Sequence, residues 1–307
     1  MLLSLVLLAV IAMGYLAQAT GLCMFKGVNE WRQGNKEHLI AILLSGVLVW
    51  VSTLFAYLTD IPFHFRIYEL NTWFLLGGFL FGLGTAFNKG CGISTLTKLT
   101  KGDIKMLATI TGWLVGWTIF AYWAPERGLI EAPLLKISHY LLFSTISVGL
   151  VIWVSFGDNK RKQLWFSMLS IGLLSGFIYL YQPKWSPNAL LSNLSKAFLD
   201  NQLHQWPSLE QYLFFIALLI GMFLGAWNRK KFLFIASSFR YWILHLLAGI
   251  LMGIGASIAL GGNSVQLLLA IPTLSPAGFI SVGGILVGIW SGIQIQKYLN
   301  NQPNDKI

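Results

Sequence analysis

The sequence has little charge. Only 10% of its 307 residues are Asp, Glu, Lys or Arg, whereas 56% are hydrophobic. A soluble domain carries about 25% charged residues, most of them on a polar surface. Because this chain has too few charged side chains for such a surface, the composition excludes a soluble enzyme. It also excludes a disordered chain, which would combine low hydrophobicity with high net charge.

Cysteine is scarce as well, with two residues, Cys23 and Cys91. Two thiols cannot form a framework of several disulfides or a four-cysteine metal site. The sequence also lacks a cluster of His and carboxylate residues, a nucleophile elbow and a phosphate-binding loop. We therefore expect no enzyme, and neither a bound metal nor a cofactor.

The hydrophobic residues gather in nine runs of sixteen to twenty residues, a length at which a helix can cross a bilayer. All eleven acidic residues fall between these runs or in the tail. The first run has no basic segment before it and no convincing cleavage site, so we interpret it as a retained helix and not as a signal peptide. The sequence predicts an all-α polytopic membrane protein with about nine transmembrane helices, at 2–19, 39–58, 72–87, 104–123, 138–156, 164–181, 211–227, 241–259 and 278–296.

The basic residues are distributed unevenly. Sixteen of the 21 Lys and Arg residues follow odd-numbered runs or lie in the C-terminal tail. Lys and Arg beside spans are retained on the cytoplasmic side, so the N-terminus is predicted outside and the C-terminus inside. This topology accounts for the net charge of +10, and we expect no nucleic-acid partner. The five basic residues on the other side are Arg66, Arg127, Lys136, Lys184 and Lys196.

A glycine pattern occurs twice, 171 residues apart. Because the copies begin on the third and the eighth runs, they enter the bilayer from opposite sides. The pattern predicts an inverted pseudo-two-fold repeat, with halves 1–135 and 164–300 joined by a helix at 138–156, as is typical of secondary transporters. Chance similarity between glycine-rich membrane helices is the alternative. The aligned pairs are Gly78 with Gly249, Gly82 with Gly253, Gly84 with Gly255, Gly90 with Gly261 and Gly112 with Gly283.

Two segments, 88–100 and 260–271, are too apolar for solvent loops and too short to cross the membrane. We predict that each is re-entrant, with a break followed by a short half-helix that begins near Cys91 or Asn263. Irregular backbone at membrane depth persists only where protein or a water-filled cavity satisfies it, so the breaks should mark a pathway. The loop 20–27, which holds Cys23, has the same character. Its counterpart in the second half would be the connection from Gln182, although no residues there match convincingly.

The first candidate site lies at the breaks on one face, with Cys23, Cys91, Lys89, Gly90 and Gly92. A cysteine in a membrane helix is often only a small hydrophobic residue. A neutral thiol can also make a passing contact with sulfur or an anion, and a thiolate would be nucleophilic. Lys89 and the nearby Lys98 would favour an anion, or they simply mark the cytoplasmic side.

The second candidate site is the opposite break, with Gly262, Asn263 and Ser264. It offers backbone amides, a side-chain amide and a hydroxyl, and no charged residue occurs from 260 to 277. The segment could be an uncharged anion cradle or an ordinary helix cap. His245 lies inside the eighth run, where an ionisable residue is either functional or satisfied by a hydrogen bond between helices.

Three motifs together resemble the YeeE/YedE sulfur-transport family over nearly the whole chain. They are Gly-Leu-Cys-Met-Phe at 21–25, the run from Gly78 that ends in Gly90-Cys91-Gly92, and the run from Gly249 through Gly262-Asn263 with Ile-Pro-Thr-Leu-Ser at 271–275. The resemblance implies a bacterial inner-membrane protein that imports thiosulfate through an hourglass-shaped path, along which cysteines contact the substrate in turn. Cys23 and Cys91 match two of those cysteines. Family members can carry a third cysteine where this chain has Asn263 and Ser264, which either replace it with neutral donors or accompany a different substrate.

We therefore expect a permease in the lipid bilayer for a small sulfur-containing anion, most simply thiosulfate. The alternative is a thiol-based membrane redox or sulfur-transfer component that passes sulfur to a cytoplasmic partner. A cytoplasmic thiol or sulfur-carrier protein is the partner expected at the basic inner loops.

Overall fold

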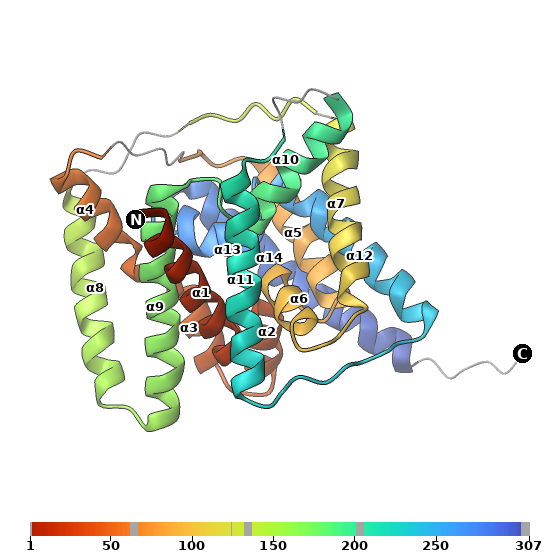
Figure 1. The fold of residues 1–307 in the computed structure, drawn as a ribbon, viewed down its shortest axis with the longest axis horizontal. Helices are drawn as coiled ribbons and strands as arrows, with labels where there is room; N and C mark the ends of the chain where they lie inside the picture. The colour runs from red at the N-terminus through yellow and green to blue at the C-terminus, as the bar shows by residue number, and fades with distance from the viewer. Residues whose placement is uncertain (1, 62–66, 124, 132–136, 201–205, 302–307) are drawn as a thin grey trace, which may run out of the picture.

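The computed structural model describes residues 2–61, 67–123, 125–131, 137–200 and 206–301, and the regular elements in these ranges are helices (Figure 1). The longer ones run side by side and enclose shorter ones. In chain order they are α1 Leu2–Thr20, α2 Met24–Arg32, α3 Glu37–Leu43, the 3₁₀ helix η1 Ser45–Val49, α4 Trp50–Leu58, α5 Thr72–Phe87, α6 Gly92–Leu99, α7 Met106–Trp123, α8 Ile137–Ser155, α9 Asn159–Tyr181, α10 Pro187–Asp200, α11 Leu209–Asn228, α12 Phe239–Ile258, α13 Asn263–Val265, the π-helix η3 Gln266–Ala270 and α14 Pro276–Asn301.

Each predicted run coincides with helical structure, which confirms an all-α polytopic membrane protein. Seven helical stretches within the described residues are long and apolar enough to cross a membrane. The apolar part of α8, Tyr140–Ser155, is shorter, and α5 has 16 residues. The number of nine crossings therefore stays a prediction.

The predicted single helix at 39–58 is not continuous, because the 3₁₀ helix η1 separates α3 from α4. Neighbouring backbones approach η1 closely. A Cβ atom at Gly46 would overlap the carbonyl oxygen of Leu267, and one at Gly172 in α9 would overlap that of Ser45. These tertiary contacts lie far apart in sequence, so hydropathy could not predict the interruption.

Two segments interpreted as loops, within 24–32 and 187–200, are in fact the helices α2 and α10. Both are short and carry several polar residues, so neither forms a hydropathy run. Each follows a long membrane helix after a break of only a few residues, at Gly21–Cys23 after α1 and at Gln182–Ser186 after α9.

Glycines allow two pairs of helices to touch backbone to backbone. A Cβ atom at Gly82 in α5 would overlap the Ile285 carbonyl of α14. The residue 171 positions later is Gly253 in α12, where a Cβ atom would likewise overlap the Trp113 carbonyl of α7. Small residues at helix contacts are the usual basis of close packing in membranes. The α5–α14 and α7–α12 contacts are thus counterparts of each other under the 171-residue shift.

The crossing of α5 with α12 is reciprocal as well. A Cβ atom at Gly84 would lie 2.7 Å from the Ala248 carbonyl oxygen, and one at Gly255 would lie 2.6 Å from the Gly77 carbonyl oxygen. The 171-residue shift converts the first pair into the second. The contacts are those that the predicted inverted repeat would produce, although the repeat itself stays a prediction.

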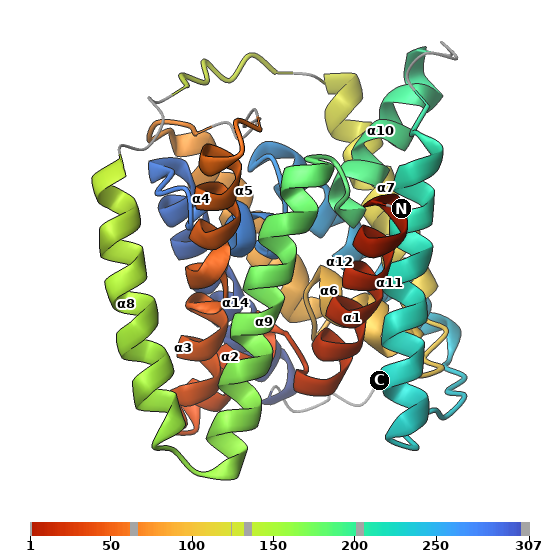
Figure 2. The ribbon, with the colours of Figure 1, turned by 60° about the vertical axis from the view of Figure 1, so that its left-hand side comes forward.

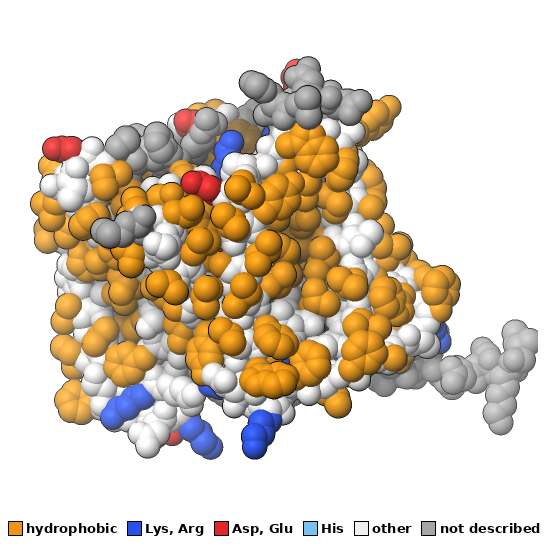
Figure 3. Space-filling view, in the orientation of Figure 1, with side chains coloured by type: hydrophobic (Ala, Val, Ile, Leu, Met, Phe, Trp, Pro, Cys, Tyr) orange, Lys and Arg blue, Asp and Glu red, His pale blue; other side chains and the backbone are white. Residues whose placement is uncertain are grey.

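The loops after odd-numbered predicted runs lie at one end of the molecule. Figures 1 and 2 show the α8–α9 and α11–α12 connections at the lower end, with α8 at the edge of the bundle beside α4 and α9. Lys and Arg side chains gather along that end, below a broad belt of hydrophobic side chains (Figure 3). Arg66, Lys136 and Lys306, which entered the charge comparison, lie outside the described residues.

Candidate functional site

The break before Cys91 has a defined backbone geometry. Helix α5 ends in a Schellman motif, in which the N–H of Lys89 donates to the Ala86 carbonyl and that of Gly90 donates to the Thr85 carbonyl. Lys89 adopts the left-handed conformation with φ 53°, a region in which glycine is usual. Helix α6 then begins at Gly92 with Cys91 as its N-cap residue, as predicted.

The second break repeats this geometry 171 residues later. Leu260 has φ 58°, close to the 53° of Lys89, and the N–H of Gly261 donates to the Ala256 carbonyl. Gly262 is the N-cap residue of α13 with φ −80° and ψ −171°, whereas Cys91 has φ −78° and ψ −179°. The predicted half-helix near Asn263 is present, and its first residue occupies the position equivalent to Gly92. The two breaks therefore share their backbone angles on either side of the middle glycine, although Gly261 has φ 151° and Gly90 does not adopt this region, and their side chains differ.

Asn88 holds the first break in place. Its side-chain N–H₂ donates to the Gly90 carbonyl at 2.7 Å and to the Thr95 hydroxyl at 2.8 Å. Its carbonyl oxygen accepts from the Thr109 hydroxyl at 2.8 Å and contacts His245 Nδ1 at 2.7 Å. All four hydrogen-bonding positions of this buried amide are used. His245 is thus a buried histidine with a hydrogen bond between helices, one of the two alternatives that the sequence left open.

Replacing Asn88 by leucine should strongly destabilise the protein. Leucine has a similar volume, but it leaves the four buried partners of the amide without their bonds, and we expect a loss of about 2–4 kcal/mol. Thr109→Val removes only one of these bonds and should cost about 1 kcal/mol. The thermal unfolding midpoints of the purified proteins in detergent measure both effects. Equal midpoints for Asn88→Leu and the wild type would contradict the role of Asn88.

The two cysteines meet, although 68 positions separate them. Both are free and buried. The Cys91 thiol contacts the Leu22 carbonyl oxygen at 3.8 Å, and the side chains of Cys23 and Cys91 interact directly. Cys23 is the N-cap residue of α2, and the Ser94 hydroxyl also interacts with it. The breaks before α2 and α6 therefore place two thiols and a hydroxyl at one point of the core.

The glycines and lysines beside Cys91 have separate roles. Gly90 allows the side chains of Ser94 and Lys98 to approach the backbone closely, because a Cβ atom there would overlap the Ser94 hydroxyl and lie 3.2 Å from Lys98 Nζ. Gly92 packs against the Trp113 ring. Lys98 Nζ donates to the Lys89 carbonyl oxygen at 2.8 Å. The Lys89 side chain itself is exposed. The charge that lies close to the backbone of the break is therefore that of Lys98, and Lys89 takes part through its carbonyl oxygen.

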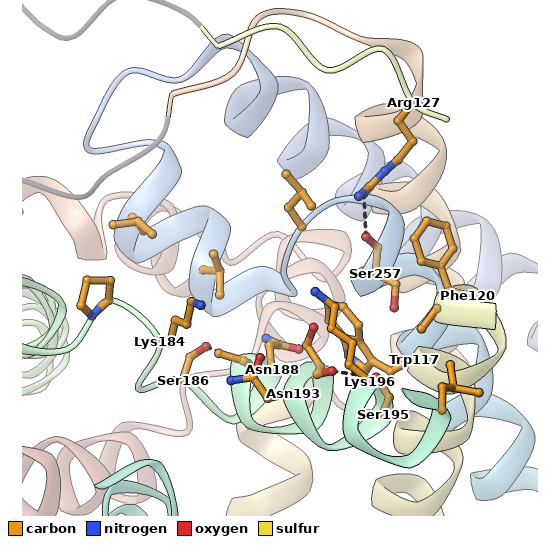
Figure 4. Close-up of a pocket in the computed structure, with 18 of the residues that line it drawn as sticks. Trp117, Phe120, Arg127, Lys184, Ser186, Asn188, Asn193, Ser195, Lys196 and Ser257 are labelled. Carbon is orange, nitrogen blue, oxygen red and sulfur yellow. Dashed lines mark hydrogen bonds between the residues drawn. The ribbon is translucent and has the colours of Figure 1, made fainter. Parts of the chain in front are cut away.

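A cavity of about 750 Å³ opens at the other end of the molecule (Figure 4). Its lining includes Arg127, Lys184 and Lys196, three of the five basic residues that the charge analysis placed on this side. The Arg127 guanidinium donates to the carbonyl oxygens of Ser257 and Ile258 at 3.0 and 3.1 Å. Partial burial lowers its pKa, yet arginine stays charged in proteins. The cavity is thus a positively charged depression whose wall combines polar and apolar side chains.

The cavity leads toward the cysteines through a narrow space. Tyr179 and Ser186 line both the cavity and a void of about 10 Å³. That void is also lined by Leu22 and by Ser264, from the second candidate site. A space of this size holds about one water molecule at most. The lining residues therefore connect the cavity to the backbone beside Cys23, while the passage itself is closed.

The remaining residues of the second candidate site are placed nearby. Asn263 is buried, and Gly262 packs against Phe81, close to the Asn188 amide. Asn188, Tyr179 and Trp117 also line the cavity, and their sequence context did not predict this position. The one signal for this region was the presence of Arg127, Lys184 and Lys196 on the side that is poor in basic residues.

Comparison with known proteins identifies the family to which the chain belongs. No curated protein matches the chain. The model of a family described as sulphur transport matches it twice, over residues 20–156 and 130–291. Together the two matches cover most of the chain, including both cysteines and both helix breaks. The chain therefore belongs to the YeeE/YedE sulphur transport family and is a membrane transporter of a sulfur compound.

Proposed function

We propose that this protein is a permease that imports thiosulfate, and that the anion passes the thiols of Cys23 and Cys91. The observation that carries the proposal is the meeting of the two free cysteines at one buried point, beneath a cavity that opens at the opposite end. Transport through this path requires no bond to be made or broken, so the protein acts as a permease and not as an enzyme.

The chemistry of the path suits an anion that must be bound weakly enough to leave. The cationic cavity attracts the anion, and Arg127, Lys184 and Lys196 line it. Beyond the narrow void, the two thiols offer weak S–H donors and polarisable sulfur, which match the terminal sulfur of thiosulfate. The first backbone N–H groups of α6 point from its N-terminus and favour negative charge near Cys91.

The two helix breaks also support an inverted repeat. The two breaks share their backbone angles on either side of the middle glycine and one cap hydrogen bond, and the glycine contacts of α5, α7, α12 and α14 are reciprocal. In transporters with inverted repeats, the site lies where the broken helices of the two halves meet. Here the two breaks carry Cys91 on one side and Gly262, Asn263 and Ser264 on the other.

The distribution of basic residues supports an orientation. With the basic end inside, the N-terminus lies outside, the C-terminus lies in the cytoplasm, and the large cavity opens outward in a bacterial inner membrane. The anion would then leave at the basic end, beside Lys98 and Lys101, where a cytoplasmic thiol or sulfur-carrier protein could receive it.

Growth on a single sulfur source tests the proposal. A bacterial strain that lacks its own sulfate and thiosulfate importers should grow on thiosulfate when it expresses this protein, and should not grow with an empty vector. Cysteine in the medium should support both strains equally. Failure to grow on thiosulfate, with the protein detected in the inner membrane, would contradict the proposal.

A further inference from the structure

We propose that Tyr179, Trp185 and Ser186 form an uncharged binding site for a sulfur oxyanion at the floor of the outer cavity, which the anion occupies before it reaches the cysteines. This inference rests on the proposed function and adds a second binding step to it. The three residues belong to the end of α9 and to the break between α9 and α10.

These residues lie at the boundary between the outer cavity and the void below it. Tyr179 and Ser186 line the cavity and also the void below it, and Trp185 lines the void. All three are buried, with exposed fractions of 1%, 4% and 4%. The rings of Tyr179 and Trp185 pack edge to face, with centroids 5.4 Å apart and an interplanar angle of 63°. An anion that moves from the cavity to Leu22 and Cys23 must pass these two rings.

The site has hydrogen-bond donors that the protein does not use. Within the part of the chain that the structure describes, the Trp185 indole N–H has no hydrogen-bond partner. The Tyr179 hydroxyl interacts with Ser186, but no hydrogen bond of regular geometry to any described residue satisfies it. A buried donor without a partner is costly. Since an indole N–H can only donate, a group that accepts hydrogen bonds is what the site needs.

The lining of the void indicates the class of ligand. The residues around it are all uncharged, so an ion that rests above it, at the floor of the cavity, is held there by hydrogen bonds and not by an opposite charge. A tetrahedral oxyanion presents several acceptor oxygens and no donor, which matches an indole N–H and hydroxyl groups. A cation or a donor-rich neutral molecule does not match. Lys184 lines the cavity one residue before Trp185 and supplies the nearest positive charge in this segment.

The α1–α2 break gives independent support. There, Cys23 is the N-cap residue of α2, directly after Leu22. In the α9–α10 break, the Ser186 hydroxyl accepts from the backbone N–H of Ala189 and so caps α10, directly after Trp185. Leu22 and Trp185 line the same void from opposite halves of the chain. Ser186 thus takes the place that Cys23 has in the first half, with a hydroxyl in place of the thiol.

Binding to the purified full-length protein tests the site. Trp185→Phe keeps an aromatic ring and removes the N–H, and Tyr179→Phe removes only the hydroxyl. Each should raise the dissociation constant for thiosulfate about 10-fold or more, because each removes a hydrogen bond to a charged ligand. Isothermal titration calorimetry in detergent measures the constants. Trp290→Phe and Tyr122→Phe make the same changes at exposed positions and should bind like the wild type.

Uptake into proteoliposomes separates the two proposals. Suppose that wild-type vesicles take up thiosulfate and that Trp185→Phe and Tyr179→Phe both bind it as tightly as the wild type. The proposed binding site would then be wrong, and the proposed function would stand. If wild-type vesicles take up no thiosulfate, the proposed function itself fails. Should Trp185→Phe fail to fold, Tyr179→Phe alone decides, since it removes a single oxygen atom and leaves the ring in place.

Discussion

Cys91→Ala should lower the rate of thiosulfate uptake at least about 10-fold, while the protein stays folded. The thiol is completely buried and interacts with Cys23. Because the chain has two cysteines, alanine removes one of the two thiols that can contact the anion. Losing a hydrogen bond to a charged group costs about 1.5–3 kcal/mol, which corresponds to roughly 10- to 150-fold. Uptake by vesicles with equal amounts of protein measures the effect, and an unchanged unfolding midpoint shows that the fold is intact.

Cys91→Ser separates a permease from a sulfur-transfer protein. A hydroxyl still donates a hydrogen bond, so a path of weak contacts should keep part of its rate with serine. A mechanism that stores sulfur as a persulfide on Cys91 needs a nucleophilic thiol, and serine should then be as inactive as alanine. Uptake by Cys91→Ala at the wild-type rate would show that Cys91 is only a small residue in the core.

Gly288→Val should prevent α14 from packing against α5. A Cβ atom at position 288 would overlap the Phe79 carbonyl oxygen and lie 3.0 Å from Gly82 Cα. Both neighbours are backbone atoms, which cannot turn away as a side chain could, so the helices must separate. Overpacking typically costs about 1–3 kcal/mol, and here we expect at least about 3 kcal/mol.

Gly283→Val is the matched control in the same helix. A Cβ atom at Gly283 has open space within 4 Å among the described residues, so valine there should change stability by less than about 1 kcal/mol. The yield of monodisperse protein and the unfolding midpoint in detergent measure both variants. If Gly288→Val behaved like Gly283→Val, the backbone contact between α5 and α14 would be wrong.

The sequence predicted those parts of the fold that depend on local hydropathy. Runs of apolar residues located the long helices, and the glycine and polar residues around Cys91 and Asn263 located the half-helices. Contacts between segments that are distant in the sequence could not be predicted from local hydropathy. The interruption of the run at 39–58 follows from the approach of Gly172 to Ser45, and α10 has no apolar run that hydropathy could detect.

The candidate site could be predicted only in part. Cys23 and Cys91 were identifiable because each lies at a glycine-flanked break, yet only the folded chain brings them together. Tyr179 gave no signal, because an aromatic residue inside an apolar run is usual in any membrane helix. Asn88 gave none either, since its role depends on Thr109 and His245 in two other helices.

Uptake of labelled thiosulfate into proteoliposomes that contain only this protein tests the transport claim most directly. We expect saturable uptake well above that of protein-free vesicles, with competition by unlabelled thiosulfate stronger than that by sulfate or sulfite. Selenium analogues in the same assay show how far the path depends on sulfur. Vesicles that hold folded wild-type protein in both orientations and accumulate none of these anions would contradict the proposed function.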